Sequence, residues 1–171
     1  NPGRRDYLVK YFLDLSKKFK IKIFLIDPDK FIPSFSVSKK TFNFISPTLS
    51  NKKKFVIFLK KFVKKNKIHV IFPISEHELQ TLADEKMYFE KIGVCVVISK
   101  SKIIQLCNDK LLTNEFLLKN KILFPKVLSY KKINKNLPVI KKDIFGNGSK
   151  DQGIIKNTNE IPKINHKKYF F

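Results

Sequence analysis

The sequence predicts an α/β fold in which a parallel-sheet domain is followed by a smaller α+β unit. Over the first 100 residues, short and continuously apolar runs alternate with amphipathic helical patterns. This alternation is typical of a parallel sheet that helices cover on both faces. Further along, Pro125, Pro138 and Pro162 interrupt shorter strand-like runs. We therefore expect one domain over residues 1–107 and a second over residues 108–171.

The helices of the first domain are predicted from apolar stripes and from one capping signal. Apolar residues at helical spacing predict helices over residues 4–18, around 55–62 and over 101–107. Ser75 and Glu78 have the spacing of a capping box, which should start a helix that runs to about residue 92.

The strands are predicted from apolar runs that end in turn residues. The expected strands are 21–26, 68–74 and 94–98, with 41–45 as a further short candidate and 31–40 ambiguous. Right-handed crossovers leave few arrangements, so the first three should be neighbours in one parallel sheet. In such a fold a strand also precedes the first helix, and we expect that strand to lie upstream of Asn1.

The second unit should open with a helix and continue in short strands. Asn108 and Asp109 are expected to cap a helix from Lys110 to about residue 120. Short strands are predicted over 126–129, 138–143, 154–156 and 169–171.

The chain is strongly basic, with a formal net charge of +22 at pH 7. Nearly all of this charge is lysine, because only Arg4 and Arg5 are arginine, and specific base readout favours arginine. Lysine, asparagine, isoleucine and phenylalanine are enriched together, as AT-rich codons would produce. We therefore do not expect nucleic acid as a partner, although a basic binding module without catalysis is the competing function.

Apolar content and cysteine usage indicate a globular protein of a reducing compartment. No apolar run reaches membrane-spanning length, so no membrane partner is expected. Cys95 and Cys107 lack metal-ligand spacing. Cys95 lies in an apolar run and is expected to be a buried free thiol, which fits the cytoplasm. His69 also lies in an apolar run and is expected to pack in the core.

The most informative motif is the segment from Pro138 to Gly153, in which an apolar run ends on two lysines and enters a glycine-rich loop. Glycine lets the backbone approach an oxyanion closely, and successive N–H groups can cradle phosphates. The loop is not a Walker A motif, because no Gly-Lys-Ser/Thr closes it. An ordinary hairpin turn is the alternative interpretation.

Three segments in order, residues 1–12, 107–113 and 138–153, resemble the ATP-grasp superfamily, in the branch of the large chain of carbamoyl-phosphate synthase. The resemblance implies a Rossmann-like pre-ATP-grasp domain over 1–107 and a truncated N-terminal ATP-grasp subdomain over 108–171. It implies ATP as cofactor. It also implies Mg²⁺, whose ligands are expected in the part of the fold that follows Phe171.

Five residues match the nucleotide-binding positions of that family. The resemblance assigns the nucleotide phosphates to Lys110, Lys142, Gly146, Gly148 and Ser149. Asp143 departs from the family pattern, which has proline after the second lysine. Lys141 adds a cation, but its side chain should project to the opposite face of the strand.

The implied activity is ligation of a carboxylate to an amine or other nucleophile, through an acyl phosphate. No catalytic residue and no metal ligand is assigned within the chain. Glu76 and His77 follow a predicted strand. We interpret them as the start of a helix in preference to a contribution to the acceptor site. A degenerate or split protein that needs a partner chain to complete the cleft is a further alternative.

Overall fold

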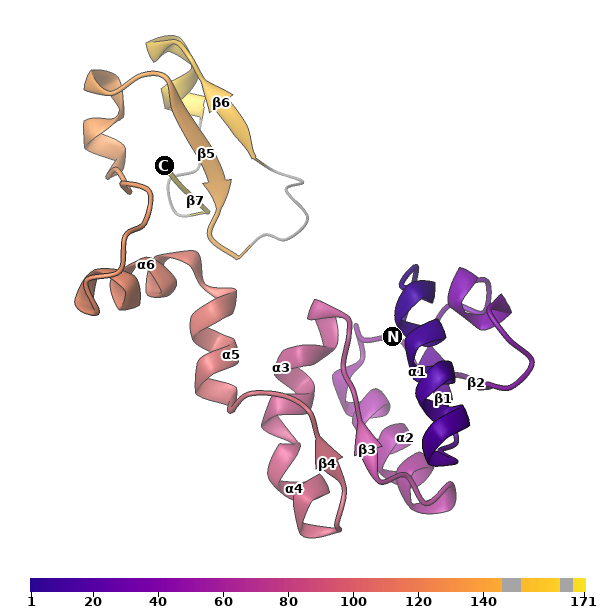
Figure 1. Cartoon of the computed structure of the whole chain (residues 1–171). Helices are drawn as coiled ribbons and strands as arrows, with labels where there is room; N and C mark the ends of the chain where they lie inside the picture. The colour runs from indigo at the N-terminus through magenta and orange to yellow at the C-terminus, as the bar shows by residue number, and fades with distance from the viewer. Residues whose placement is uncertain (146–151, 164–167) are drawn as a thin grey trace. The chain divides into compact units, whose positions relative to one another are not determined.

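The computed structural model describes residues 1–145, 152–163 and 168–171. The chain divides into two compact units, Asn1–Ser101 and Lys102–Phe171 (Figure 1). The predicted boundary between residues 107 and 108 falls at the end of helix α5 (Ser101–Asn108). No helix in the described part of the chain is long and apolar enough to cross a bilayer.

The first unit alternates helices and strands. Its elements are α1 (Asp6–Phe19), β1 (Phe24–Asp27), a 3₁₀ turn (Pro33–Ser36), β2 (Phe42–Ile45), α2 (Lys52–Lys65), β3 (Val70–Ile71), α3 (Glu76–Asp84), α4 (Lys86–Lys91) and β4 (Cys95–Val96). The capping box of Ser75 and Glu78 is present at the start of α3. The single helix predicted to run to residue 92 is instead two helices that meet at Glu85.

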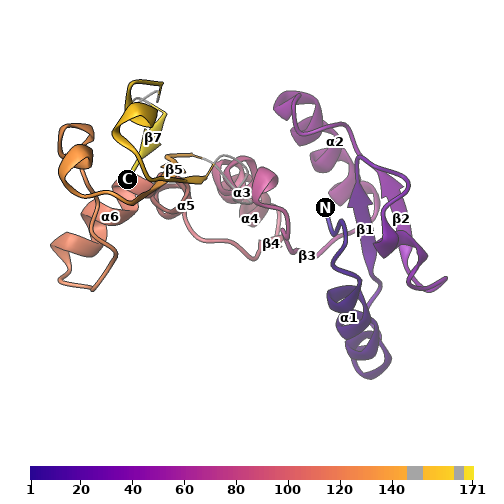
Figure 2. The ribbon, with the colours of Figure 1, turned by 90° about the horizontal axis from the view of Figure 1, so that it is seen from above.

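The strands of the first unit are parallel, which confirms the predicted α/β class. β1 pairs with β2, with Leu25 opposite Asn43, and β3 pairs with β4, with Val70 opposite Cys95. The expected single sheet is divided, because β1 and β3 belong to separate two-stranded sheets (Figures 1 and 2). The prediction that run 21–26 neighbours run 68–74 was therefore wrong, because a cavity of about 730 Å³, lined by Ile26 of β1 and Ile71 of β3, separates the two strands.

One hydrophobic core joins helix α2 to both sheets. Its buried members are Phe55, Leu59 and Val63 of α2, Leu82 of α3, Phe89 of α4, and Val94 and Val96 at β4. Phe62 of α2 also contacts the rings of Phe24 and Phe44 on the other sheet, edge to face. Because α2 touches β1, β2 and β4 through one apolar face, it holds the divided sheet together.

The opposite face of the β3–β4 sheet is largely open. Val70 and Phe72 are 53% and 48% exposed, and α1 reaches this face through Phe12, whose ring lies 5.3 Å from that of Phe72. His69 and Cys95 are also exposed. The predictions of a packed histidine and a buried thiol were therefore wrong. Cys95 pairs with Val70 and lies on this open face, whereas His69 stands just before the first residue of β3 and is exposed there.

The second unit contains a small antiparallel sheet. After α5 come α6 (Lys110–Lys119), a 3₁₀ turn (Tyr130–Lys135), β5 (Val139–Asp143), β6 (Gly153–Ile155), a 3₁₀ turn (Thr158–Lys163) and β7 (Tyr169–Phe170), with strand order β6-β5-β7. The predicted strand over 126–129 does not form, whereas those at 138–143, 154–156 and 169–171 are close to the observed ones. The core of this unit consists of Ile133, Val139, Ile155, Ile161 and Phe171.

We predict that Phe89→Ala lowers the free energy of unfolding by about 3–5 kcal/mol, because it empties a fully enclosed core position. Phe89 is 1% exposed, and Met87 on the same short helix is 69% exposed. Met87→Ala is therefore the matched control and should change stability by less than about 0.5 kcal/mol. Urea unfolding followed by circular dichroism measures both, and equal effects would contradict this account of the core.

Candidate functional site

In the second unit, helix α6 begins beside the end of strand β5. Asp109 caps the helix, since one of its carboxylate oxygens accepts hydrogen bonds from the backbone N–H groups of Leu111 and Leu112, at 2.8 and 3.1 Å. The backbone N–H of Lys110 donates to the carbonyl of Ile144 at 3.1 Å. The cap and this bond together fix the first turn of α6 against Ile144, the residue that follows β5.

The ammonium group of Lys110 is held at the same place. Its Nζ donates to the carbonyl oxygen of Asp143 at 2.7 Å and to that of Ile144 at 3.4 Å. These carbonyls stand where the chain leaves β5 and enters the glycine-rich loop. The structure thus places one positive charge at the root of that loop.

The two adjacent lysines of β5 lie on opposite faces of the strand. Lys141 shares the inner face with the buried Val139, and its Nζ lies 4.4 Å from the centre of the Tyr169 ring. Lys142 is exposed on the other face. Lys141 is thus engaged in a cation–π contact, which leaves Lys142 as the lysine of the pair that faces solvent.

Asp143, the residue where proline was expected, has a structural role here. One carboxylate oxygen accepts a hydrogen bond from the Phe145 N–H at 3.1 Å, and the other lies 3.7 Å from the ammonium of Lys168. Its carbonyl oxygen is also the acceptor of the shorter Lys110 bond. Asp143 therefore stabilises the turn after β5 to which Lys110 is also bonded.

The remaining predicted residues, Gly146, Gly148 and Ser149, lie outside the described residues. Their assignment, and with it the phosphate site as a whole, stays a prediction. Over residues 1–145, 152–163 and 168–171, no group of three or more His, Cys, Asp or Glu side chains could hold a metal ion. The acidic side chains near the site are used within the protein, Asp109 as a cap and Asp143 in its turn, so they do not fit a Mg²⁺ ligand set.

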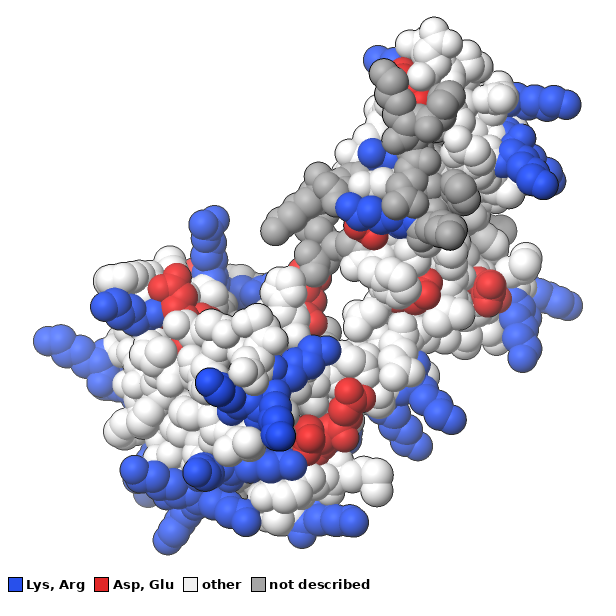
Figure 3. Space-filling view, turned by 180° about the vertical axis from the view of Figure 1, so that it is seen from behind, with Lys and Arg blue, Asp and Glu red and all other residues white. Residues whose placement is uncertain are grey.

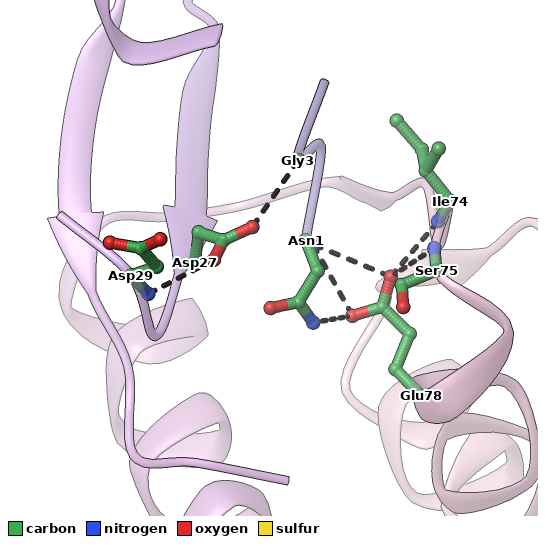
Figure 4. Close-up of polar contacts among 7 residues, drawn as sticks. All are labelled: Asn1, Gly3, Asp27, Asp29, Ile74, Ser75 and Glu78. Carbon is green, nitrogen blue, oxygen red and sulfur yellow. Dashed lines mark hydrogen bonds and ion pairs between the residues drawn. The ribbon is translucent and has the colours of Figure 1, made fainter. Parts of the chain in front are cut away.

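A second polar cluster lies in the first unit, at the carboxyl ends of its strands (Figure 4). Glu78 is buried, with 3% of the residue exposed, and its carboxylate is the centre of the cluster. It accepts hydrogen bonds from the backbone N–H groups of Ile74 and Ser75 at 2.9 and 3.0 Å. It also accepts a side-chain hydrogen bond from Asn1, whose terminal ammonium lies 3.3 Å away. Glu78 therefore ties the loop after β3 to the first residue of the chain.

Asp27 anchors the same opening loop from the end of β1. One of its carboxylate oxygens accepts from the Gly3 N–H at 3.3 Å and the other from the Asp29 N–H at 3.0 Å. Gly3 has a φ of +53°, in the left-handed region that glycine favours. Figure 4 shows Asn1 between the end of β1 and the start of α3.

Sequence reasoning missed the role of Asp27. The available signal was a carboxylate that directly ends an apolar run, at the sheet edge where α/β folds gather polar groups. Glu76 and His77, by contrast, are exposed in the first turn of α3. Within residues 1–101, the side chains of Glu76 and His77 form no hydrogen bond with Asn1, Asp27 or Glu78.

Positive charge is spread over both units. On the face shown in Figure 3, Lys and Arg side chains project from much of the surface, and Asp and Glu form small groups between them. Lysines that stand apart in this way are typical of solvated faces.

Comparison with known proteins identifies a family for the first unit and solved structures of similar fold over most of the chain. The family described as PylC-like, N-terminal domain, matches residues 1–97. Among solved structures, N5-carboxyaminoimidazole ribonucleotide synthetase from Thermotoga maritima is similar, with 21% identity and a TM-score of 0.62 over 91% of this chain and 40% of that one. No curated protein matches the chain.

Two biotin carboxylases have the same fold over this part. The biotin carboxylase domain of the 2-oxoglutarate carboxylase from Hydrogenobacter thermophilus, crystallised with MgADP, ADP and bicarbonate, is 15% identical, with a TM-score of 0.64 over 86% of this chain and 35% of that one. The biotin carboxylase of Campylobacter jejuni, in a β-γ-ATP complex, is 13% identical, with a TM-score of 0.66 over 88% and 36%. The chain thus spans about two fifths or less of the length of these structures.

We predict that Glu78→Ala lowers the free energy of unfolding by about 1–3 kcal/mol, because it leaves buried N–H groups without an acceptor. Glu76→Ala, in the same helical turn but exposed, is the matched control and should cost less than about 0.5 kcal/mol. Thermal unfolding of the whole chain measures both. If both variants lost the same free energy of unfolding, the negative charge that each glutamate places in the first turn of α3 would matter more than the buried hydrogen bonds of Glu78.

Proposed function

Since the chain belongs to the PylC-like N-terminal domain family, we propose that it forms the N-terminal part of an ATP-grasp ligase. Its fold is that of the N-terminal part of ATP-grasp enzymes, as the sequence predicted. In this proposal residues 1–107 are the pre-ATP-grasp domain and residues 108–171 begin the ATP-grasp subdomain. The finer placement in the carbamoyl-phosphate synthase branch is part of the proposal.

The proposed reaction joins a carboxylate to an amine in two steps. A carboxylate oxygen attacks the γ-phosphorus of ATP, the bond to the ADP oxygen breaks, and an acyl phosphate forms. The amine then attacks the acyl carbon, inorganic phosphate leaves, and the nitrogen loses a proton to give the amide. The protein's part in the first step is to neutralise the charge on the transferring phosphoryl group.

The observation that carries the proposal is the position of Lys110. Its ammonium is bonded to the carbonyls at the end of β5, 2.7 Å from that of Asp143, which supports a role for Lys110 in binding the nucleotide phosphates. Lys142, the residue before Asp143 in β5, supplies a second ammonium group, and this group faces solvent. Gly146, Gly148 and Ser149 would add backbone N–H donors and a hydroxyl from the loop.

The substrates and the setting are also proposed. A small carboxylate and an amine are the expected substrates, with Glu76 and His77 as candidate contacts to the acceptor because both are exposed after β3. Mg²⁺ would be held by residues outside this chain, so no step is assigned to it here. The exposed thiols of Cys95 and Cys107 support a reducing compartment such as the cytoplasm.

We predict that Lys142→Ala, in the full-length protein that contains this chain, weakens ATP binding by roughly 10- to 150-fold, as expected for a lost hydrogen bond to a charged group. Lys141→Ala is the matched control and should have a much smaller effect, because Lys141 packs on Tyr169. Isothermal titration calorimetry measures both. A larger effect at Lys141 would show that the two lysines have been assigned in the wrong register.

We also predict that Gly148→Val lowers kcat more than it weakens ATP binding, because a β-branched residue would stiffen the loop and obstruct its approach to the transferring phosphate. Gly153→Val is the control from the same segment, since a Cβ at Gly153 would meet nothing within 4 Å. Steady-state ADP release and equilibrium binding separate the two effects. If Gly148→Val kept full kcat, the loop would not act in phosphoryl transfer.

A further inference from the structure

Lysine side chains are concentrated at one end of the first unit. Helices α1, α2 and α4 each lead into a strand, β1, β3 and β4 respectively, and Figure 3 shows blue side chains gathered at the lower end of the unit, where these helices end. The lysines that the three connections carry are Lys17, Lys18, Lys20, Lys22, Lys64, Lys65, Lys67 and Lys91, and all of them are exposed. We call this surface the basic edge.

The opposite end of the same unit carries most of the acidic side chains near the strands. These are Asp27, Asp29, Glu76 and Glu78, at or after the carboxyl ends of β1 and β3 (Figure 4). Close to the basic edge, the carboxylates of Asp14 and Glu90 are already paired with lysines of their own helices, at 2.7 and 3.6 Å. AT-rich codons would enrich lysine throughout the chain, but they would not separate the two signs of charge between the ends of one unit.

The ends of helices account for only part of the basic edge. Lysines in the last turn of a helix are favoured by the helix dipole, which explains those that end α1 and α2. Lys20 and Lys67 lie beyond these helices and have φ values of 52° and 51°. Glycine or asparagine usually occupies this left-handed conformation after a helix. The positive charge at these two positions is therefore present despite a backbone conformation that favours other residues.

Exposed apolar side chains lie between the lysines. Residues 18–22 are Lys-Phe-Lys-Ile-Lys, and all five are exposed. Phe19 is 60% exposed, Ile21 is 46% exposed, and Ile92, which follows Lys91, is 39% exposed. A partner of the basic edge must therefore accept both positive charge and apolar side chains.

A membrane with anionic lipids combines these two properties. Acidic headgroups attract clustered lysines, and the layer beneath the headgroups takes up side chains such as Phe and Ile. Nucleic acid fits less well, because its recognition favours the planar fork of arginine, and Arg4 and Arg5 lie at the other end of α1. Contact with a membrane surface needs no spanning helix. We therefore propose that the basic edge binds the surface of membranes that contain anionic lipids.

The proposal concerns the first unit alone and does not depend on nucleotide binding. The basic edge belongs to residues 17–22, 64–67 and 91–92, whereas Lys110 and β5 belong to the second unit. Because the lysines are exposed, their attraction to headgroups should weaken as salt is added. Variants of the basic edge should therefore change vesicle binding and leave the affinity of the full-length protein for ATP unchanged.

The first test measures co-sedimentation of the whole chain with vesicles of phosphatidylcholine and phosphatidylserine. Lys20→Gly and Lys67→Gly each remove one charge at a position whose backbone favours glycine, so the fold is kept. Lys121→Gly is the matched control, because Lys121 has a φ of 56° and lies in the second unit. We expect each variant of the basic edge to bind about fivefold more weakly, and the control to change binding by less than about twofold. Equal losses in all three variants would overturn the proposal.

The second test examines the apolar part of the contact. Phe19→Gln should weaken vesicle binding by about fivefold. Phe31→Gln is the matched control, since Phe31 is 80% exposed and follows β1 at the opposite end of the unit. Both rings also lie beside a lysine ammonium, at 5.3 Å for Phe19 and 4.8 Å for Phe31. Unchanged binding of Phe19→Gln would contradict insertion into the lipid surface.

Two further measurements identify the partner. Vesicles of phosphatidylcholine alone should bind weakly, and binding as tight as that to the mixed vesicles would overturn the role of lipid charge. The single-stranded RNA poly(U) tests the alternative polyanion. We expect poly(U) to bind more weakly than the mixed vesicles, and tighter binding of poly(U) that is lost in Lys20→Gly would assign the basic edge to nucleic acid and overturn the proposal.

Discussion

Parallel pairing is the constraint on which the first unit depends. Parallel strands cannot be joined by tight turns, so each pair needs a crossover, and the crossover helices must cover the sheet that they connect. Helix α2 meets this need from one side, because Phe55, Leu59 and Val63 pack on the strands and on α3 and α4. Phe62 extends this contact to Phe24 and Phe44. The two sheets are therefore held by one helix, although β1 and β3 do not pair across the cavity between them.

Local signals in the sequence were sufficient for most elements of the fold. The capping box of Ser75 and Glu78 predicted the start of α3 because both partners lie within one helical turn. Burial was predicted less well, because it depends on neighbours that a local pattern does not specify. His69 and Cys95 lie in apolar runs that indicate covered strands, yet both are exposed. Cys95 lies with Val70 on the face that has little cover, and His69 stands just before the first residue of β3.

At the candidate nucleotide site, too, the sequence predicted the kind of chemistry but not the arrangement of the residues in space. The types of residue, two lysines before a glycine-rich loop, indicated phosphate binding from the sequence. That Lys110 would bond to the carbonyls after β5 was not predictable, because the two segments are separated by more than thirty positions. Asp143 departs from the family pattern, and its carboxylate accepts a hydrogen bond from the Phe145 N–H in the turn that follows β5.

The polar groups of the first unit also limit where a substrate could bind. Asp27 and Glu78 are buried and already accept hydrogen bonds from Gly3, Asp29, Ile74 and Ser75, so binding a substrate amine would require them to give up bonds that hold the loop. Removing an acceptor from a buried N–H group costs about as much as a hydrogen bond contributes. The two carboxylates therefore shape the carboxyl edge of the sheet and are not free acceptors for a ligand.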